Sequence, residues 1–194
     1  MDIESNIIET HPFPPFINHD TRLLIMGTFP PQPKRWSMEF YYPNRTNDFW
    51  YIMGLIFFGD KTALLQHGKK TFDLDRIKRF LTDEKIGLSD TGFKVRRLQG
   101  NASDKFLEIL ESVPLENILR NYPNITTLCT TGEKAAGVIA ELTDTGLPKM
   151  GEMLHTDSGI EIWRMPSTSR AYPMKIEKKA EYYATMFRHA GILS

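Results

Sequence analysis

Cysteine is almost absent from this sequence: its 194 residues include one, Cys129. A single cysteine excludes an intrachain disulfide framework, a cysteine zinc site and an iron–sulfur cluster. No apolar run approaches the roughly 18 residues that a membrane span needs. The amino terminus carries Asp2 and Glu4 and lacks the basic start and apolar core of a signal peptide. We therefore expect a cytoplasmic protein with no membrane partner.

An excess of charge of either sign is also missing. Lys plus Arg is 24 and Asp plus Glu is 24, so the formal net charge is +0. This balance argues against a protein held to nucleic acid by bulk charge alone. Basic residues nevertheless gather in a few segments, among them Lys34, Arg35, Arg45 and Arg170. The distribution predicts one positive groove, whose binding to nucleic acid weakens as salt rises.

Several common functional motifs are absent. There is no phosphate-binding or dinucleotide-binding glycine motif. Residues 87–91 nearly match the hydrolase pattern G-x-S-x-G but end in Thr91 instead of glycine. The histidines show no metal-ligand spacing, so we expect no metal site and expect each histidine at the surface or capping a helix. These histidines are His11, His19, His67, His155 and His189.

The length fits one domain, here residues 21–194, preceded by an extended arm over residues 1–20. The arm is predicted from its prolines, which fix φ and remove backbone donors. Its phenylalanines indicate that it lies against the rest of the protein.

Apolar and β-branched runs predict strands at residues 23–26, 125–130 and 160–165. Helical spacing of apolar residues predicts helices at residues 48–57, 73–84, 103–112, 114–121, 133–142 and 176–190. Thr46 or Asn47 can cap the first helix and Ser103 the third. Cys129 falls inside a predicted strand, where a buried cysteine acts as a small apolar residue.

Strands separated by helices predict an α/β fold, a three-layer α/β/α sandwich with a central, mostly parallel sheet. Ligands in such folds collect at the carboxyl ends of the strands. Here these ends are the loops that begin at Gly27, Thr131 and Pro166, so we expect the functional site there.

Two loop motifs carry the strongest functional signal. The first combines GTFP at residues 27–30 with YYPNRTNDFW at residues 41–50, and the second is MPSTSR at residues 165–170. With residues 86–90 and 131–135, this ordered set resembles the uracil-DNA glycosylase superfamily, and within it most closely the hypoxanthine-DNA glycosylase branch. The resemblance extends from about residue 23 to residue 187.

The resemblance implies an activity. Members of the superfamily flip a damaged base out of DNA and hydrolyse its N-glycosidic bond without a cofactor. Extrusion costs a few kcal/mol of stacking and pairing, and the bond breaks through an oxocarbenium-like sugar. We expect a monomer that excises hypoxanthine, xanthine or uracil from damaged DNA, as duplex or single strand, at the nucleoid.

The resemblance also implies roles for particular residues. Asn47 is the catalytic candidate, binding the base or positioning water, with Asn44 as the competing residue. Tyr42 would stack on the flipped base, a contact that contributes roughly 1–3 kcal/mol. The other substrate-binding candidates are Gly27, Thr28, Phe29 and Pro30. The DNA-binding candidates, whose hydroxyl and cationic groups suit phosphate, are Ser167, Thr168, Ser169, Arg170 and Lys134.

Simpler interpretations of the same residues stay open. Asn47 can cap the helix that follows it, Tyr42 can be one aromatic of a packed loop, and residues 167–170 can form a polar turn. Phe29 stands where many superfamily members have Asp or Asn, and Met165 where many have His. Both fit the hypoxanthine branch, but they make strong uracil activity unexpected. They also motivate an alternative, a catalytically inactive DNA- or nucleotide-binding module, beside a third, a small-molecule hydrolase.

Overall fold

The computed structural model describes residues 7–98 and 104–194. Its centre is a five-stranded sheet in the order β3–β2–β6–β8–β7. The parallel strands are β2 (Leu23–Gly27), β3 (Ile86–Asp90), β6 (Thr127–Thr131) and β8 (Glu161–Met165). The edge strand β7 (Met153–His155) runs antiparallel to β8. The strands expected at residues 23–26, 125–130 and 160–165 are thus confirmed, with ends shifted by up to two residues.

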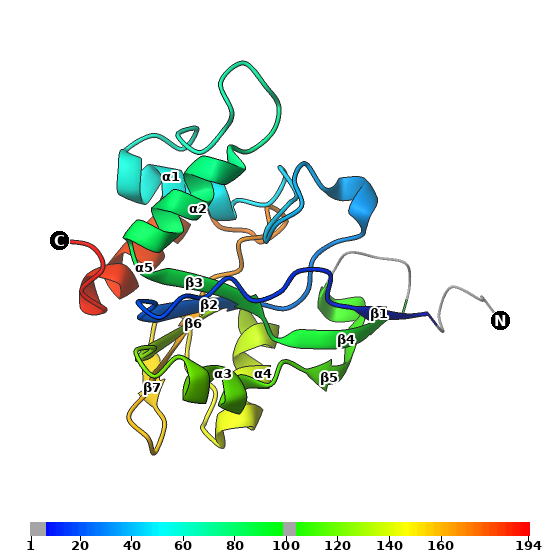
Figure 1. Cartoon of the computed structure of the whole chain (residues 1–194), viewed down its shortest axis with the longest axis vertical. Coiled ribbons are helices and arrows are strands. Elements are labelled where there is room, and N and C mark those ends of the chain that lie inside the picture. The colour runs from blue at the N-terminus through cyan, green and yellow to red at the C-terminus, as the bar shows by residue number, and fades with distance from the viewer. Residues whose placement is uncertain (1–6, 99–103) are drawn as a thin grey trace.

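Helices cover both faces of this sheet (Figure 1). On one face lie α1 (Phe49–Phe58), α2 (Leu74–Asp83) and α5 (Ile176–His189). On the other lie α3 (Leu115–Asn121) and α4 (Glu133–Thr143). Five of the predicted helices are therefore confirmed, as is the three-layer α/β/α fold.

Strand β2 shows why the apolar runs produce this arrangement. Leu23 and Ile25 pack into the core beneath α1, α2 and α5, whereas Leu24 and Met26 pack into the core with α3 and α4. All four side chains are completely buried. Because alternate residues of a strand point to opposite faces, a strand covered on both sides must be apolar throughout.

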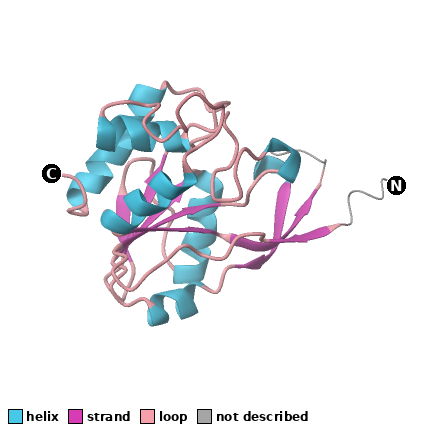
Figure 2. Ribbon diagram, turned by 45° about the horizontal axis from the view of Figure 1, so that its top comes forward, coloured by secondary structure: helices cyan, strands magenta, loops and turns pink. Residues whose placement is uncertain are grey.

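A smaller antiparallel sheet, in the order β1–β4–β5, extends from one side of the molecule (Figure 2). Its strands are β1 (Ile8–Thr10), β4 (Gly92–Arg97) and β5 (Leu107–Ser112). Strand β1 belongs to the amino-terminal arm. Further along the arm, Phe16 exchanges backbone hydrogen bonds of 2.9 Å with Leu88 of β3. The division into an arm and one domain at residue 21 stays a prediction.

The prediction of a helix at residues 103–112 is wrong. Residues Asp104–Phe106 form one 3-10 turn, and Leu107–Ser112 are strand β5. Leu107 and Leu110 are three residues apart, which imitates a helical face. These residues instead pair with β4, the preceding strand, with Val95 opposite Ile109, because pairing with another strand overrides local spacing. Ser103, the expected cap, lies outside the described residues.

None of the helices in residues 7–98 and 104–194 combines the length and apolar character needed to cross a membrane.

Candidate functional site

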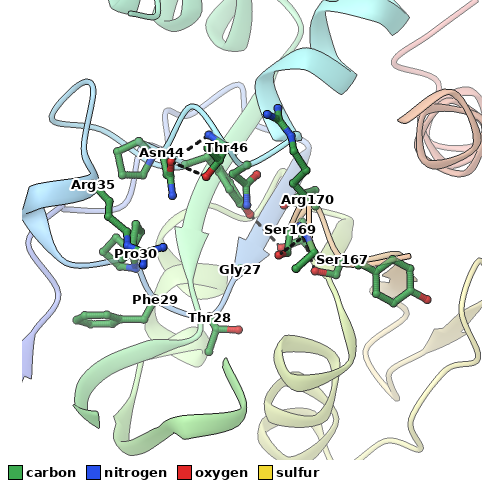
Figure 3. Close-up of a pocket in the computed structure, with 18 of the residues that line it drawn as sticks. Gly27, Thr28, Phe29, Pro30, Arg35, Asn44, Thr46, Ser167, Ser169 and Arg170 are labelled. Carbon is green, nitrogen blue, oxygen red and sulfur yellow. Dashed lines mark hydrogen bonds between the residues drawn. The ribbon is translucent and has the colours of Figure 1, made fainter. Parts of the chain in front are cut away.

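The carboxyl ends of the parallel strands open into one cavity of about 600 Å³. Drug-sized ligands typically occupy pockets of about 300–1,000 Å³. Residues from both sequence motifs line it, as Figure 3 shows for the labelled side chains. Of the candidates named from the sequence, those that line it are Gly27, Thr28, Phe29, Pro30, Tyr42, Asn44, Asn47, Ser167, Thr168, Ser169 and Arg170.

Backbone contacts join the two motif loops into one rim. Asn47 and Ser169 form an isolated antiparallel bridge. Beside it, the Asp48 amide donates a 2.8 Å hydrogen bond to the Thr168 carbonyl. These bonds bring segments far apart in the sequence into direct contact.

A buried carboxylate fixes this junction. Asp48 accepts a 3.0 Å bond from Nζ of Lys179, in α5, and another of 3.0 Å from Nε of Arg170. The same Lys179 ammonium, which is fully buried, donates to the Ser169 carbonyl at 2.8 Å. Burying a charge is tolerated only where it is paired and hydrogen-bonded. Helix α5 therefore holds both motif loops through one pair of charges.

Tyr42 lies with its ring against the ring of Phe49, the centroids 3.8 Å apart and the planes 14° from parallel. Its hydroxyl is 3.1 Å from the Thr131 hydroxyl. The backbone of Tyr42 has a φ of 52°, a left-handed conformation that is uncommon outside glycine. Such conformations cluster at ligand sites because the surrounding structure must maintain them. Tyr42 is thus held rigidly at the cavity wall, and its stacking on a base stays a prediction.

Asn47 is half-buried at the rim of the cavity. Its Oδ1 accepts a 2.9 Å hydrogen bond from the Phe49 amide at the start of α1. The side chain therefore satisfies one of the unpaired amides of the helix start. This bond engages the oxygen and leaves the amide nitrogen able to donate. Capping and a catalytic role are thus compatible, and the catalytic role stays a prediction.

Asp90, at the end of β3, is the main lining residue that sequence reasoning left without a role. Its Oδ1 lies 2.8 Å from where a Cβ on Gly27 would be, and the Tyr42 hydroxyl lies 2.9 Å from that point. Glycine is therefore the residue that lets a carboxylate and a phenol meet over the end of β2. The buried run 86–89 followed by Asp90 is typical of a parallel strand. Because ligands in such folds collect at the carboxyl ends of the strands, the sequence could have indicated Asp90 as a site residue.

Asp90 is paired with the amino-terminal arm. Its Oδ2 lies 2.7 Å from Nε2 of His11, and the two side chains are 7% and 6% exposed. The expectation that every histidine lies at the surface or caps a helix is therefore wrong for His11. Its ring packs against Phe29 and Tyr41. Burial, and secondarily the charge of Asp90, raises the pKa of Tyr41 well above its usual value.

The outer part of the cavity is polar and carries cations. Arg35, Ser167, Ser169 and Arg170 line it, and all four are at least partly exposed. The Arg170 side chain is 54% exposed despite its contact with Asp48. Cationic and hydroxyl groups of this kind suit the oxygens of phosphates. This arrangement could bind an anionic ligand along the rim.

Two residues lie away from the cavity. Lys134, in α4, donates from Nζ to the Leu107 carbonyl and is not among the lining residues. Its DNA contact therefore stays a prediction. Cys129 is fully buried in the core, and burial raises the pKa of its thiol. The described residues include no cluster of three or more His, Cys, Asp or Glu side chains that could hold a metal ion.

Comparison with known proteins gives relatives of one kind, although no family model matches the chain. A hypoxanthine DNA glycosylase of Methanosarcina barkeri is 31% identical over 124 residues, which is 63% of this chain and 71% of that protein. A hypoxanthine DNA glycosylase of Methanosarcina acetivorans is 26% identical over 177 residues, 91% of this chain and 97% of that protein.

A solved structure supports the fold. It is a solution NMR structure of a provisionally described uracil-DNA glycosylase from Methanosarcina acetivorans. The similarity covers 95% of this chain and 99% of that one, with a TM-score of 0.67 and 23% sequence identity. The order of layers deduced from the apolar runs is thus shared with a known three-dimensional structure.

Proposed function

This chain belongs to the hypoxanthine-DNA glycosylase branch of the uracil-DNA glycosylase superfamily, and from this membership we propose that it is a monofunctional DNA glycosylase. Its substrate is a deaminated base in DNA, with hypoxanthine first and xanthine or uracil next. The observation that carries the proposal is the junction of the two motif loops around one cavity, with Tyr42 and Asn47 on its wall.

The reaction that this site would perform is a hydrolysis. The base leaves with the electron pair of the bond between C1′ and the base nitrogen, and the sugar becomes oxocarbenium-like. Water adds its oxygen to C1′ and releases one proton, and the departing base gains a proton. Because negative charge develops on the base, a fixed donor stabilises the transition state more than the ground state. We assign this donor role, or the orientation of the water, to the Asn47 amide nitrogen, because Asn47 lines the cavity and its oxygen already accepts from the Phe49 amide.

Contacts along the rim and wall of the cavity would hold the DNA and the extruded base. Ser167, Ser169 and Arg170 would bind phosphate oxygens beside the extruded nucleotide, which positions the strand without reading its sequence. Tyr42 would offer its ring to the base, a stacking contact of roughly 1–3 kcal/mol. The protein would act as a monomer on DNA, in the cytoplasm at the nucleoid.

The first test is a panel of duplexes that each carry a single hypoxanthine, xanthine or uracil. Excision leaves an abasic site, which alkali converts to a strand break. We expect breaks at hypoxanthine first, and we expect Asn47→Ala to lower the excision rate by about 10²–10³-fold, the usual effect of removing one transition-state donor. Unchanged excision by this variant would remove Asn47 from the mechanism.

Two further variants separate the roles of the amide. Asn47→Asp keeps an oxygen that can accept from the Phe49 amide but lacks the donating nitrogen, so we expect it to fold like the wild type and to excise slowly. Asn44→Ala removes the competing amide, whose Oδ1 already accepts from the Thr46 amide and hydroxyl. We expect its loss of rate to be smaller than that of Asn47→Ala.

One observation favours the second candidate, an inactive binding module. Met165, which ends β8 and begins the second motif, is buried in the core with 1% exposure and offers no side-chain donor to the cavity. Lesion-selective DNA binding without strand breaks at any base of the panel would favour this candidate over the enzyme.

A further inference from the structure

The loop between α1 and α2 carries cations that do not belong to the cavity. Residues 61–72 include Lys61, Lys69 and Lys70 and no acidic residue. The loop projects beyond both helices at the top of Figure 1. Lys69 and Lys70 are exposed, and within the described part of the chain neither side chain has an ion-pair or hydrogen-bond partner.

The acidic residues that border this loop are engaged with their own backbone. Asp60 accepts from the amide and the hydroxyl of Thr62 at 2.8 Å and 2.7 Å. Asp73 accepts from the Arg76 amide at 3.0 Å and so caps α2. By contrast, Lys178 on α5 is neutralised by a carboxylate at 2.7 Å. Cations without a nearby counter-charge attract an anion from outside the molecule.

Residues 65–72 form a short hairpin, which we call the basic hairpin. Leu65 and Phe72 make an antiparallel bridge at its base, and the Gln66 amide donates to the Thr71 carbonyl at 2.9 Å. Gly68 turns the chain at a φ of 70°, in the left-handed region that glycine adopts without strain. Phe72 is buried with 3% exposure. The two lysines at the turn are therefore presented from a fixed base.

The base of the basic hairpin lies beside the phosphate-binding part of the cavity rim. The Arg170 guanidinium lies 5.5 Å from the centre of the Tyr51 ring, and the Tyr51 and Phe72 rings are 5.7 Å apart. The Thr71 hydroxyl donates at 2.6 Å to the carbonyl of Ser37, which lies between the two parts of the first motif. Two ring contacts thus connect the rim to the basic hairpin.

This placement matches the spacing of charges along DNA. Phosphates of one strand follow one another about every 3.4 Å along the helix axis. A duplex with one phosphate on Arg170 therefore brings further phosphates to the basic hairpin within a few nucleotides. Lysine side chains bind phosphates without reading the sequence, so they position the duplex. Only one flank of the lesion can cross the hairpin, because the hairpin lies to one side of Arg170.

We propose that the basic hairpin is a second DNA-contact surface, on which Lys69 and Lys70 bind phosphates of the duplex that flanks the lesion on one side. The proposal rests on the proposed function for one point, that the cavity receives a base from DNA.

The test uses two duplexes of equal length with a single hypoxanthine nucleotide, placed close to the 5′ end of its strand in one and close to the 3′ end in the other. Each duplex therefore offers a long flank on one side only. A 2′-fluorine on the target sugar disfavours the oxocarbenium-like state, so fluorescence anisotropy measures binding without excision.

The double variant Lys69→Glu, Lys70→Glu should bind one of the two duplexes about tenfold or more weakly and leave the affinity for the other nearly unchanged. For the affected duplex, the dependence of log K on log salt should become shallower by about two, one for each lost phosphate contact. Lys69→Arg, Lys70→Arg keeps both charges and should bind both duplexes like the wild type.

The matched control is the double variant Arg22→Glu, Lys85→Glu. These exposed residues precede β2 and β3 at the edge of the sheet opposite the cavity. The control changes the net charge of the protein by the same amount, so it measures the effect of overall charge. It should affect both duplexes alike and only slightly. A thermal melt of each variant checks its fold, and Lys69→Gln, Lys70→Gln should show a smaller loss on the same duplex.

Each outcome decides the proposal. Equal losses on both duplexes, or a loss no larger than that of the control, would overturn the role of the basic hairpin. Excision from the unfluorinated duplexes is measured in parallel. Excision by the wild type without a one-sided loss overturns the hairpin and leaves the glycosylase activity in place. A one-sided loss without any excision overturns the glycosylase activity and leaves the hairpin, and a wild type that binds neither duplex overturns both.

Discussion

At the scale of single residues, the cavity depends on a position that has no side chain. Gly27 ends β2 where the carboxylate of Asp90 and the hydroxyl of Tyr42 converge, and no larger residue leaves both in place. Gly137, in α4, has nothing within 4 Å of its would-be Cβ. The two glycines therefore differ in what a methyl group would do.

We expect Gly27→Ala to lower kcat/KM for hypoxanthine excision by about tenfold or more, because misplacing catalytic or binding groups by 1 Å can cost about 10²-fold. Gly137→Ala should leave kcat/KM unchanged and stabilise the fold by about 0.5–1 kcal/mol, since alanine loses less entropy in a helix. Steady-state kinetics and urea unfolding measure the two effects. Equal rates for Gly27→Ala and the wild type would show that Asp90 and Tyr42 need not hold these positions.

At the scale of elements, α1 and α5 are joined through charge as well as apolar packing. Asp48 precedes α1, and Lys179 lies in the second turn of α5 with its ammonium on the Asp48 carboxylate. Lys178 and Glu181, on the outside of the same helix, form an ion pair at 2.7 Å with more than half of each side chain exposed. One helix thus carries a buried and an exposed pair, which should differ greatly in their effect on stability.

Removing one partner of the buried pair should be costly. We expect Asp48→Ala to lower the free energy of unfolding by about 3–5 kcal/mol, because Lys179 would stay buried without a counter-charge. The double variant Asp48→Ala, Lys179→Met should be less destabilised than Asp48→Ala alone. Glu181→Ala should change stability by about 0.5 kcal/mol or less. Urea denaturation measures all three, and similar losses for Asp48→Ala and Glu181→Ala would contradict this account.

At the scale of the whole molecule, a formal net charge of +0 has to be reconciled with a DNA substrate. The cavity rim supplies Arg35 and Arg170. Acidic residues such as Asp75, Glu177 and Glu181 are exposed on helices α2 and α5 and do not line the cavity. Attraction to phosphate should therefore be local to the rim and to the basic hairpin beside it.

Affinity for a lesion-containing duplex should fall as salt rises, with log K decreasing linearly in log salt by about 0.9 for each phosphate neutralised. Arg35→Glu should weaken binding and reduce this slope. Arg79→Glu makes the same charge change on an exposed part of α2 and should have a much smaller effect. Fluorescence anisotropy at several salt concentrations gives the slopes. A wild-type affinity insensitive to salt would argue against a positive groove.

The sequence alone determined the layered fold and which loops meet. Residues 23–26 are all apolar, which predicts a strand covered on both faces. The carboxyl ends of parallel strands lie at one edge of the sheet, so the loops at Gly27 and Pro166 are predicted to meet there. Their meeting at one cavity follows from the parallel direction of the strands. Such features are local or periodic, so they can be predicted without knowing any distant contact.

Only the tertiary structure decided which polar groups face one another. Residues 107–112 became a strand because β4 offers a ladder, which their own spacing does not reveal. The sequence suggests that His11 is an isolated surface histidine. In the structure the arm packs against the domain, and Nε2 of His11 lies 2.7 Å from Oδ2 of Asp90. A buried polar side chain takes its role from its partner, and partners far apart in the chain are brought together by packing, not by local pattern.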